Sequence, residues 1–435
     1  MPRQMKDSEI AWIGYIPVDW ERTHLRNMLR GPITDGPHET PNYCEDGIPF
    51  ISIDSLNDSD TIDFSVVKKF ITEEDYQEYA KKAILEKGDI LFTKAATIGK
   101  TAIVGNEKFM IWSPLAIIKP DNRLCSTKYL YYVLSCKPLI EHASLQGSYN
   151  TQVNLGMKTL EKVFVPLPPI TQQNDIAAYL DKKCHHFDLV LKQTKESIEE
   201  YRRMRKALVS QAVTKGIRGD RAMRDSEVEW LGDIPADWYV YRIANLYDER
   251  SESGLEELPI LTVSINTGVS DHEIADEDKD RVFVRSEDRT KYKRVYPGDL
   301  AYNMMRAWQG AFGAVRVDGM VSPAYVVAKP KKNVELDSRY MEALLRTSEA
   351  TEEMHRYSRG IVDFRLRLYW PEFKNIRICL PSIEEQIEIA DYIDEKVAAI
   401  DDLIAKKEAF AAELENYKKS MIYEYVTGKK EVPQS

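Results

Sequence analysis

An internal repeat constrains the fold of this chain more than any other feature. The opening segment EIAWIGYIPVDW ends at Trp20 and returns as EVEWLGDIPADW, which ends at Trp238, an offset of 238 − 20 = 218 residues. A Gly-Asp pair ending at Asp89 returns at Asp299, and VPLPPITQQNDIAAYLDKK returns as ICLPSIEEQIEIADYIDEK. Because self-similarity at several places indicates a duplicated architecture, we expect two similar halves related by a pseudo-twofold repeat.

Each half ends in a predicted long helix. Apolar side chains recur at steps of three and four residues from Ile176 to Tyr201 and again from Ile393 to Met421, which is the spacing of one helical face. Neither run contains Gly or Pro before Gly216 and Gly428, the expected kind of helix stop. At roughly 40 residues and about 1.5 Å per residue, such a helix is on the order of 60 Å long.

The two predicted helices are expected to pair. A narrow apolar seam on a long helix requires a partner, and the nearest candidate is its own repeat. The segment from Lys215 to Glu229 is short and polar, so we predict an antiparallel coiled coil; docking of the seams into other proteins is the alternative. Ser382 followed by Glu385 predicts a capping box at the start of the second helix.

The rest of the chain mixes short strands with helices. ILFTKAATI, TAIVG and MIWSPLAIIKP have the composition of strands, whereas YLYYVLSCKPLIEHASL and YMEALLRTSEATEEMHRY have that of helices. We therefore predict an α+β protein with two globular mixed α/β domains joined by the long helices. The predicted segments are a first domain at 1–165, a first helix at 166–220, a second domain at 221–378, and a second helix with the tail at 379–435.

Composition favours an intracellular protein. No apolar stretch approaches the length that crosses a bilayer, and the polar start of the chain does not resemble a leader, so we expect a cytoplasmic protein without membrane contact. The five cysteines are scattered, which suggests neither a disulfide framework nor a zinc site. His185-His186 is the only histidine pair, and its two side chains point to different faces of a helix, so no metal site is expected.

Charge is unevenly distributed along the chain. The net charge is −10, which by itself argues against a nucleic-acid ligand. Residues 81–160, however, carry 11 Lys or Arg against 5 Asp or Glu, and residues 281–378 carry 19 against 12. Either basic segment alone reads as ordinary solvated charge, but one basic segment falls within each half.

The segment KAATIGKT ends like a phosphate-binding loop at Gly99-Lys100-Thr101. The full pattern requires a second glycine five residues before Gly99, where this chain has Lys94. The residues that follow form a short apolar run rather than a helix, and the second half has no matching lysine. We therefore predict a strand and a turn here, not a nucleotide site.

Two polar loops stand at the same place in the two halves. Asn and Gln suit adenine edges and Arg suits guanine edges in a DNA major groove. Any one such loop is more often only a polar turn, but two equivalent loops, each beside a basic segment, are credible base readers. The first loop offers Ser148, Tyr149, Asn150, Gln152 and Asn154, and the second offers Arg359, Arg365 and Arg367.

With these residues in view, the chain resembles the specificity subunit of type I restriction-modification systems over essentially its whole length. The most specific features are the duplicated openings WIGYIPVDW and WLGDIPADW, the GDIL segment, and the LPPITQQNDIAAYLD and LPSIEEQIEIADYID blocks. The resemblance implies two target recognition domains that each read half of a bipartite, asymmetric sequence in double-stranded DNA. It also implies two antiparallel helices that set the spacer and dock two methyltransferase subunits, in a complex that recruits restriction/translocase subunits.

The resemblance also suggests further DNA-facing positions. In the first half these are Lys94, Thr97, Lys100 and Thr101, and in the second half they are Arg306, Trp308 and Gln309. Trp308 could equally be a core aromatic.

Other function classes were weighed against this one. The sequence has no Asn-Pro-Pro-aromatic methyltransfer motif, no complete phosphate loop and no nucleophile elbow, so we expect a non-catalytic chain that binds no cofactor itself, with S-adenosylmethionine, ATP and Mg on partner subunits. A DNA-free coiled-coil scaffold would explain the helices but not the paired loops. A specificity protein of a fused restriction enzyme is allowed by the same motifs.

Overall fold

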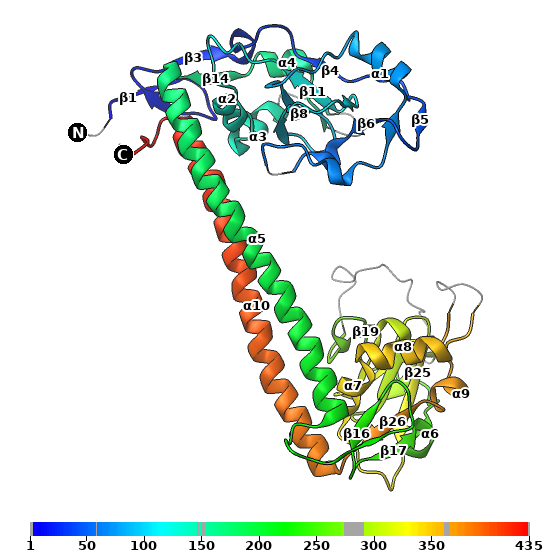
Figure 1. The fold of residues 1–435 in the computed structure, drawn as a ribbon. Coiled ribbons are helices and arrows are strands. Elements are labelled where there is room, and N and C mark those ends of the chain that lie inside the picture. Colours follow the sequence, from blue (N-terminus) through cyan, green and yellow to red (C-terminus); the bar gives the residue numbers. More distant parts are fainter. Residues whose placement is uncertain are drawn as a thin grey trace. The chain divides into compact units, whose positions relative to one another are not determined.

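The chain folds into two compact units, and both long helices contribute to each. The first unit comprises Met1–Thr194 and Ala409–Ser435, and the second comprises Lys195–Glu408. Figure 1 shows the ribbon. The computed structural model describes residues 3–57, 59–145, 148–149, 153–273, 291–360 and 366–433.

The first unit is built from short strands and helices that lead into the long helix α5 (Ile170–Lys215). Its strands are β1 (Met5–Asp7), β2 (Tyr15–Pro17), β3 (Glu21–His24), β4 (Thr34–Asp35), β5 (Tyr43–Cys44), β6 (Ile48–Ile51), β7 (Phe70–Ile71), β8 (Ile90–Thr93), β9 (Thr101–Ile103), β10 (Met110–Ile111), β11 (Leu115–Ile118), β12 (Ser148–Tyr149), β13 (Val153–Asn154) and β14 (Phe164–Leu167). Its short helices are α1 (Glu73–Ala80), α2 (Thr127–Leu134), α3 (Lys137–Leu145) and α4 (Met157–Glu161).

The second unit has the same plan and leads into the long helix α10 (Ile383–Val426). Its strands are β15 (Met223–Asp225), β16 (Asp233–Pro235), β17 (Tyr239–Arg242), β18 (Tyr247–Glu249), β19 (Val263–Ser264), β20 (Gly268–Val269), β21 (Lys293–Val295), β22 (Leu300–Asn303), β23 (Phe312–Ala314), β24 (Gly319–Val321), β25 (Tyr325–Pro330) and β26 (Arg377–Leu380). Its short helices are α6 (Ile243–Leu246), the 3-10 helix η6 (Ala307–Gln309), α7 (Ser338–Leu345), α8 (Ser348–Tyr357) and α9 (Trp370–Phe373).

The repeat predicted from the sequence is present in the sheets. The central antiparallel sheet of the first unit has the order β4-β11-β8-β9, and that of the second has the order β18-β25-β22-β23. The registers correspond, because Ile118 pairs with Ile90 and Ala328 pairs with Leu300. One helix packs on each sheet: α2 contributes Tyr129 to the first core and α7 contributes its counterpart Tyr340 to the second. The α+β fold class is confirmed.

The two segments predicted as single helices are each two helices. Ser135 ends α2, and Pro138 stands in the first turn of α3, where a proline is tolerated because its missing N–H would have no helical partner. In the second unit Thr347 separates α7 from α8, and its side chain accepts a hydrogen bond from the Ala350 N–H. Helical periodicity did not reveal these breaks because each short helix continues the apolar pattern of the one before.

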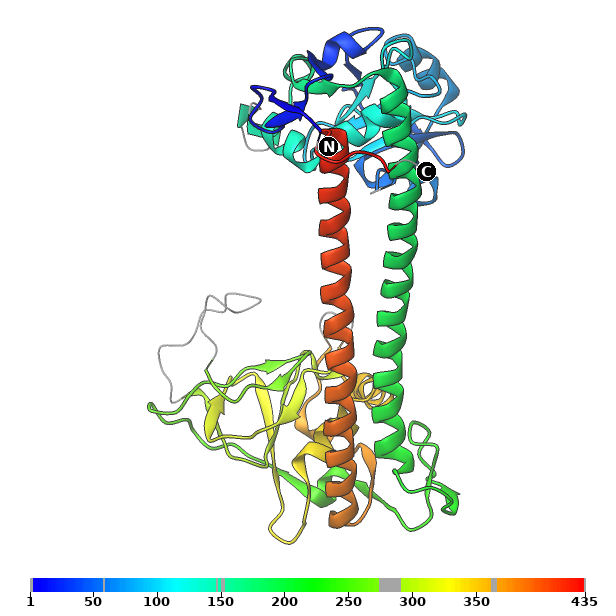
Figure 2. The same ribbon diagram turned by 90° about the vertical axis from the view of Figure 1, so that its left-hand side faces the viewer.

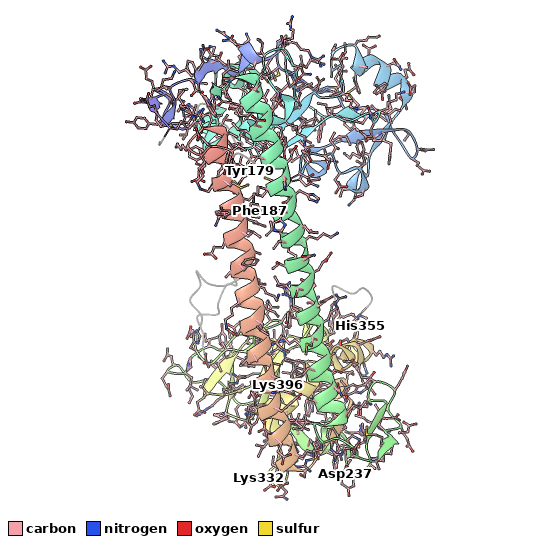
Figure 3. The ribbon with its side chains drawn as sticks, turned by 60° about the vertical axis from the view of Figure 1, so that its left-hand side comes forward. Tyr179, Phe187, Asp237, Lys332, His355 and Lys396 are labelled. Carbon is pink, nitrogen blue, oxygen red and sulfur yellow. The ribbon has the colours of Figure 1, made fainter. Side chains whose placement is uncertain are left out.

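In the first unit the long helices pack side by side and antiparallel. Tyr179 of α5 contacts Tyr425 of α10 with ring centroids 4.7 Å apart, and two turns further along α5 Phe187 contacts Tyr417 at 5.7 Å. Partner numbers on α10 fall as those on α5 rise, which defines the antiparallel direction. Figure 2 shows the helices still adjacent in a view at right angles to Figure 1, and Figure 3 shows Tyr179 and Phe187 following one another along α5.

The second unit continues the same pairing. Ile198 packs in one cluster with Ile400 and Ile404, and Arg205 forms an ion pair with Asp401 at 2.9 Å. The predicted antiparallel coiled coil is confirmed. Both stops are also confirmed, since α5 ends one residue before Gly216 and α10 ends two residues before Gly428, and these glycines have φ values of +77° and +70°.

Half of the predicted capping box is present. The Glu385 N–H donates to the Ser382 hydroxyl at 3.4 Å, but the Glu385 carboxylate turns to Trp238 and Arg221 instead of the start of its own helix. Its hydrogen bonds raise the pKa of Arg221. Tertiary partners that can donate to a carboxylate have therefore replaced the local N–H that the capping pattern predicts.

The duplicated tryptophans hold the start of each long helix. The Trp20 indole N–H donates to Gln172 at 2.8 Å, and the Trp238 indole N–H donates to Glu385 at 3.1 Å. Both indoles are buried, and an arginine lies over each, which adds a cation–π attraction. These arginines are Arg3 at 5.3 Å and Arg221 at 5.7 Å.

Two buried tyrosine hydroxyls join the long helices to the strands. The Tyr129 hydroxyl lies 3.0 Å from the carbonyl oxygen of Val426, at the end of α10, and 3.2 Å from that of Pro166 in β14. The Tyr340 hydroxyl lies 3.0 Å from the carbonyl oxygen of Val213, near the end of α5, and 3.3 Å from that of Cys379 in β26. Each tyrosine therefore links the end of one long helix to the strand that precedes the other.

The duplicated Gly-Asp pairs are structural. Asp89 and Asp299 are almost wholly buried, and each accepts a hydrogen bond from a backbone N–H three residues earlier, which closes the turn before β8 or β22. Arg30 pairs with Asp89 at 2.5 Å and Arg250 pairs with Asp299 at 2.8 Å. Burial raises the pKa of Asp299, and the hydrogen bonds from Arg250 oppose that rise.

We predict that Tyr129→Phe and Tyr340→Phe each lower the free energy of unfolding by about 1–3 kcal/mol, because each removes a hydroxyl donor from two buried carbonyl oxygens. Urea denaturation followed by circular dichroism measures this. Tyr239→Phe makes the same chemical change where the side chain is 66% exposed and should have almost no effect. Equal stability of all four proteins would show that the tyrosine links are not structural.

Candidate nucleic-acid interface

The Gly99-Lys100-Thr101 segment lies in a β-hairpin. The Gly99 N–H donates to the Thr93 carbonyl oxygen at 3.0 Å, and the Lys100 N–H donates to the Thr93 hydroxyl at 2.9 Å. β9 follows directly and pairs antiparallel with β8. A phosphate cradle requires free N–H groups at the start of a helix, whereas these groups bond within the turn. The prediction of strand and turn is confirmed.

The structure brings the two predicted DNA-facing segments of the first unit together. Ala95 forms a β-bridge with Asn154, and the Leu155 N–H donates to the Lys94 carbonyl oxygen at 2.8 Å. Thr97 and Asn154 are exposed, and Lys100 is half-buried. These residues follow the ends of β8 and β13, so they share one edge of the unit.

Lys94 and Thr101 do not face solvent, contrary to the expectation for DNA contacts. The Lys94 side chain is 9% exposed, and its ammonium group lies 3.2 Å from the Asp35 carboxylate. The Thr101 hydroxyl lies 2.6 Å from that of Ser135. The sheet forces both side chains inward, and each polar group finds a partner there.

The rest of the first predicted loop is described only in part. The backbone of Ser148 and Tyr149 forms β12, which pairs with β13. Asn150 and Gln152 lie outside the described residues.

The second unit brings equivalent segments together. The Leu368 N–H donates to the Met304 carbonyl oxygen at 2.8 Å, which repeats the bond between Leu155 and Lys94 at offsets of 368 − 155 = 213 and 304 − 94 = 210. Arg306 is half-buried and Gln309 is exposed beside η6. Trp308 is half-buried against the core of the unit, with its ring 5.2 Å from that of His355, which matches the core alternative for this residue.

Two arginines lie directly opposite each other at this edge. Arg359 and Arg367 exchange both backbone hydrogen bonds, at 2.9 and 3.0 Å, and both are exposed. The mostly buried Glu372 carboxylate holds the Arg359 guanidinium at 2.6 Å. Like charges directly opposite each other in an antiparallel pair are unfavourable, so this arrangement suits an anionic ligand. Arg365 lies outside the described residues.

Other kinds of site find no support in the described part of the chain. The described residues contain no group of three or more His, Cys, Asp or Glu placed to hold a metal ion. All five cysteines are free thiols, and four of them are buried. No helix within the described ranges is both long and apolar enough to span a membrane.

Comparison with known proteins finds similarity to type I restriction enzyme specificity subunits. Residues 17–200 match the family model of the type I restriction modification DNA specificity domain. The type I restriction enzyme MjaVIII specificity subunit of Methanocaldococcus jannaschii is 24% identical over 95% of this chain and 93% of its own length. The putative type I restriction enzyme MjaX specificity subunit of the same organism is 29% identical over 54% of each chain. Residues 17–200 are therefore similar to a type I restriction modification DNA specificity domain, and the chain is similar over most of its length to a type I specificity subunit.

A solved structure shares the fold of this chain. It was determined in work on complex assembly and conformational transition of the type I restriction-modification system. It superimposes with a TM-score of 0.65 at 14% identity and covers 95% of this chain and 99% of its own. At this level of identity the likeness concerns the fold alone.

The first unit has a polar turn at this edge that was not predicted from the sequence. Asp35 ends β4, Gly36 follows, and the exposed His38 ring nitrogen Nε2 lies 3.2 Å from the Asp35 carboxylate. A Cβ atom on Gly36 would lie 2.3 Å from the Ile111 carbonyl oxygen, so the turn packs against the backbone there. The Asp-Gly-Pro sequence at 35–37 is a turn signal, but nothing local indicates that the turn meets Lys94.

We predict that Gly36→Ala lowers the free energy of unfolding of this protein by about 1–3 kcal/mol, because a backbone carbonyl cannot yield as a flexible side chain can. Thermal unfolding measures the difference. Gly31→Ala is a matched control, since a Cβ there meets nothing within 4 Å and should change stability by at most about 0.5 kcal/mol. Similar melting of the two variants would contradict the close packing at Gly36.

Proposed function

We propose that this chain reads a bipartite, asymmetric sequence in double-stranded DNA, with each unit reading one half. The observation that carries the proposal is the pair of equivalent edges, one at Lys94 and Leu155, the other at Met304 and Leu368. The backbone bonds are the same at both edges, but the side chains around them differ. Such a difference is expected when two copies of one scaffold read different base sequences, because base edges are distinguished by the side chains that meet them.

The long helices are proposed to set the spacing between half-sites and to dock two methyltransferase subunits. Both helices are continuous, at 46 and 44 residues, and they pair with each other within each unit. Large apolar side chains are exposed on them, Leu189 and Phe410 in the first unit and Met204 and Leu403 in the second, each at least 41% exposed. Exposed apolar residues on an otherwise polar helix pair suit a protein partner.

The chain is proposed to be non-catalytic and to act in the cytoplasm. Its relatives are named as specificity subunits rather than as methyltransferases or nucleases. Binding of S-adenosylmethionine, ATP and Mg is assigned to the methyltransferase and restriction/translocase subunits. The purified chain should transfer no label from S-adenosylmethionine to DNA until a methyltransferase subunit is added.

The decisive experiment is single-molecule methylome sequencing of a strain that carries this gene together with its neighbouring methyltransferase gene. We expect methylated adenines in one split, asymmetric motif, and we expect that motif to disappear when this gene alone is deleted. An unchanged methylome, with both proteins expressed and associated, would overturn the proposal and favour a coiled-coil scaffold.

We predict that removing residues 195–201 from α5 together with 405–411 from α10 shortens the accepted spacer by about three base pairs. Seven helical residues span roughly 10 Å, and a base pair spans about 3.4 Å along the duplex. The methylome of the deletion strain reports the new spacer. Insertion of seven residues at the same two places should lengthen it equally, and an unchanged spacer in both variants would disprove the ruler role.

A further inference from the structure

Lys94 and Asp35 form an ion pair that is largely shielded from water. Their side chains are 9% and 14% exposed, with Nζ and Oδ2 3.2 Å apart. Shielding two charges costs desolvation free energy that their attraction only partly offsets, so such a pair is weak evidence for a role in stability. Its better-supported use is to hold polar groups in one arrangement.

The same carboxylate oxygen also holds an exposed imidazole. His38 is 71% exposed, and its Nε2 lies 3.2 Å from Asp35 Oδ2. An isolated surface histidine samples several rotamers. This ring instead contacts the Asp35 carboxylate, whose position is fixed by its ion pair with the buried Lys94. With Nε2 engaged by Asp35, Nδ1 is left to accept from a base amino group or, when protonated, to donate to a base carbonyl or ring nitrogen.

The backbone around this network is pinned on several sides. Asp35 pairs with Ala116 of β11, and Gly36 packs against the Ile111 carbonyl oxygen. The Lys94 N–H donates to the Pro114 carbonyl oxygen at 2.9 Å, while its own carbonyl oxygen accepts from Leu155. Through Asp35, His38 is therefore linked to Lys94, the residue whose backbone bonds to the Asn154 edge.

Among the residues that the structure describes, the second unit repeats the scaffold but not the contacts that join Lys94, Asp35 and His38. The hydrogen bond from the Leu155 N–H to the Lys94 carbonyl oxygen corresponds to that from the Leu368 N–H to the Met304 carbonyl oxygen. The second unit therefore has an uncharged methionine where the first has Lys94. The tyrosine, tryptophan and Gly-Asp contacts described above occur in both units. A polar network confined to one of two copies is expected of residues that distinguish the ligands of the copies, not of residues that maintain the shared fold.

We propose that His38 contacts a base of the half-site read by the first unit, and that Lys94 is a positioning residue that acts on His38 through Asp35. The inference rests on the proposed DNA-reading function and assigns to it a residue outside the two predicted loops. It also reassigns Lys94, which was expected to touch DNA, to a supporting role beneath the surface.

The test uses the full chain in complex with its methyltransferase subunit and a duplex that carries the motif found by methylome sequencing. His38→Ala should weaken binding to this duplex about 5- to 150-fold, the range of one lost base contact, and should leave binding to a random duplex within about twofold. Single-base variants of the duplex should show relaxed discrimination at one or two positions of one half-site only.

Lys94→Met tests the supporting role, because it removes the charge and keeps a long apolar side chain. It should relax discrimination at the same base positions as His38→Ala does. The double variant should bind the target duplex no more weakly than His38→Ala alone, because two residues that act through one contact do not have additive effects. Additive losses, or relaxation at other positions, would refute the positioning role. Thermal melting verifies that each variant is folded.

His272→Ala is the matched control, since His272 is 74% exposed and lies 2.6 Å from an adjacent aspartate in the second unit. It should leave base discrimination unchanged in the half-site that His38→Ala affects. If His38→Ala lowered the affinity for the target duplex and for the random duplex equally, His38 would contact a phosphate, and the specificity role would be overturned. A wild-type complex with no preferred motif would instead defeat the proposed function itself, so the two failures are distinguishable.

Discussion

Each core of this protein is closed by the end of a helix that belongs to the other half of the repeat. The first core contains Tyr425 and Val426 from the end of α10, and the second contains Val213 from the end of α5. The hydroxyls of Tyr129 and Tyr340 bond to these helix ends. Because a buried carbonyl without a donor is costly, neither core is complete until both long helices are in place. Folding of each unit and pairing of the helices are therefore linked.

This linkage separates residues that maintain the scaffold from residues that can vary. The tryptophan, tyrosine and Gly-Asp contacts occur twice because both units face the same packing problem. The exposed edges beside Lys94 and Met304 share only backbone hydrogen bonds, so their side chains are free to differ. The proposed function needs this division, because the two units share one architecture while the base sequences proposed for them differ.

Charge at these edges follows a common physical pattern. Asp35 in the first unit and Glu372 in the second are mostly buried carboxylates, and each holds an exposed nitrogen-bearing side chain, His38 and Arg359 respectively. A buried anion beneath an exposed donor fixes the direction of that donor at a small entropic cost on binding. The acidic net charge of the chain is thus compatible with a surface that binds an anion, since local arrangement outweighs the total.

Much of this architecture could be predicted without coordinates. The repeat, the α+β class and the antiparallel pairing of the long helices follow from local signals: periodicity, the stops at Gly216 and Gly428, and a short linker. The breaks before α3 and α8 were not predicted because each short helix continues the apolar pattern of the one before. The diversion of Glu385 from its capping role could not be predicted because its partners, Trp238 and Arg221, come from distant segments. The same limit explains why a surface role was expected for Lys94 and Thr101.

The division between these two sources of information has a physical cause. Helices and turns depend on neighbours within a few residues, so composition and spacing along the chain determined the repeat, the helix lengths and their ends. The orientation of a polar side chain depends on what the sheet brings against it. Only the folded structure decided that Lys94 meets Asp35 beside His38, because two segments separated by tens of residues must meet before those contacts exist.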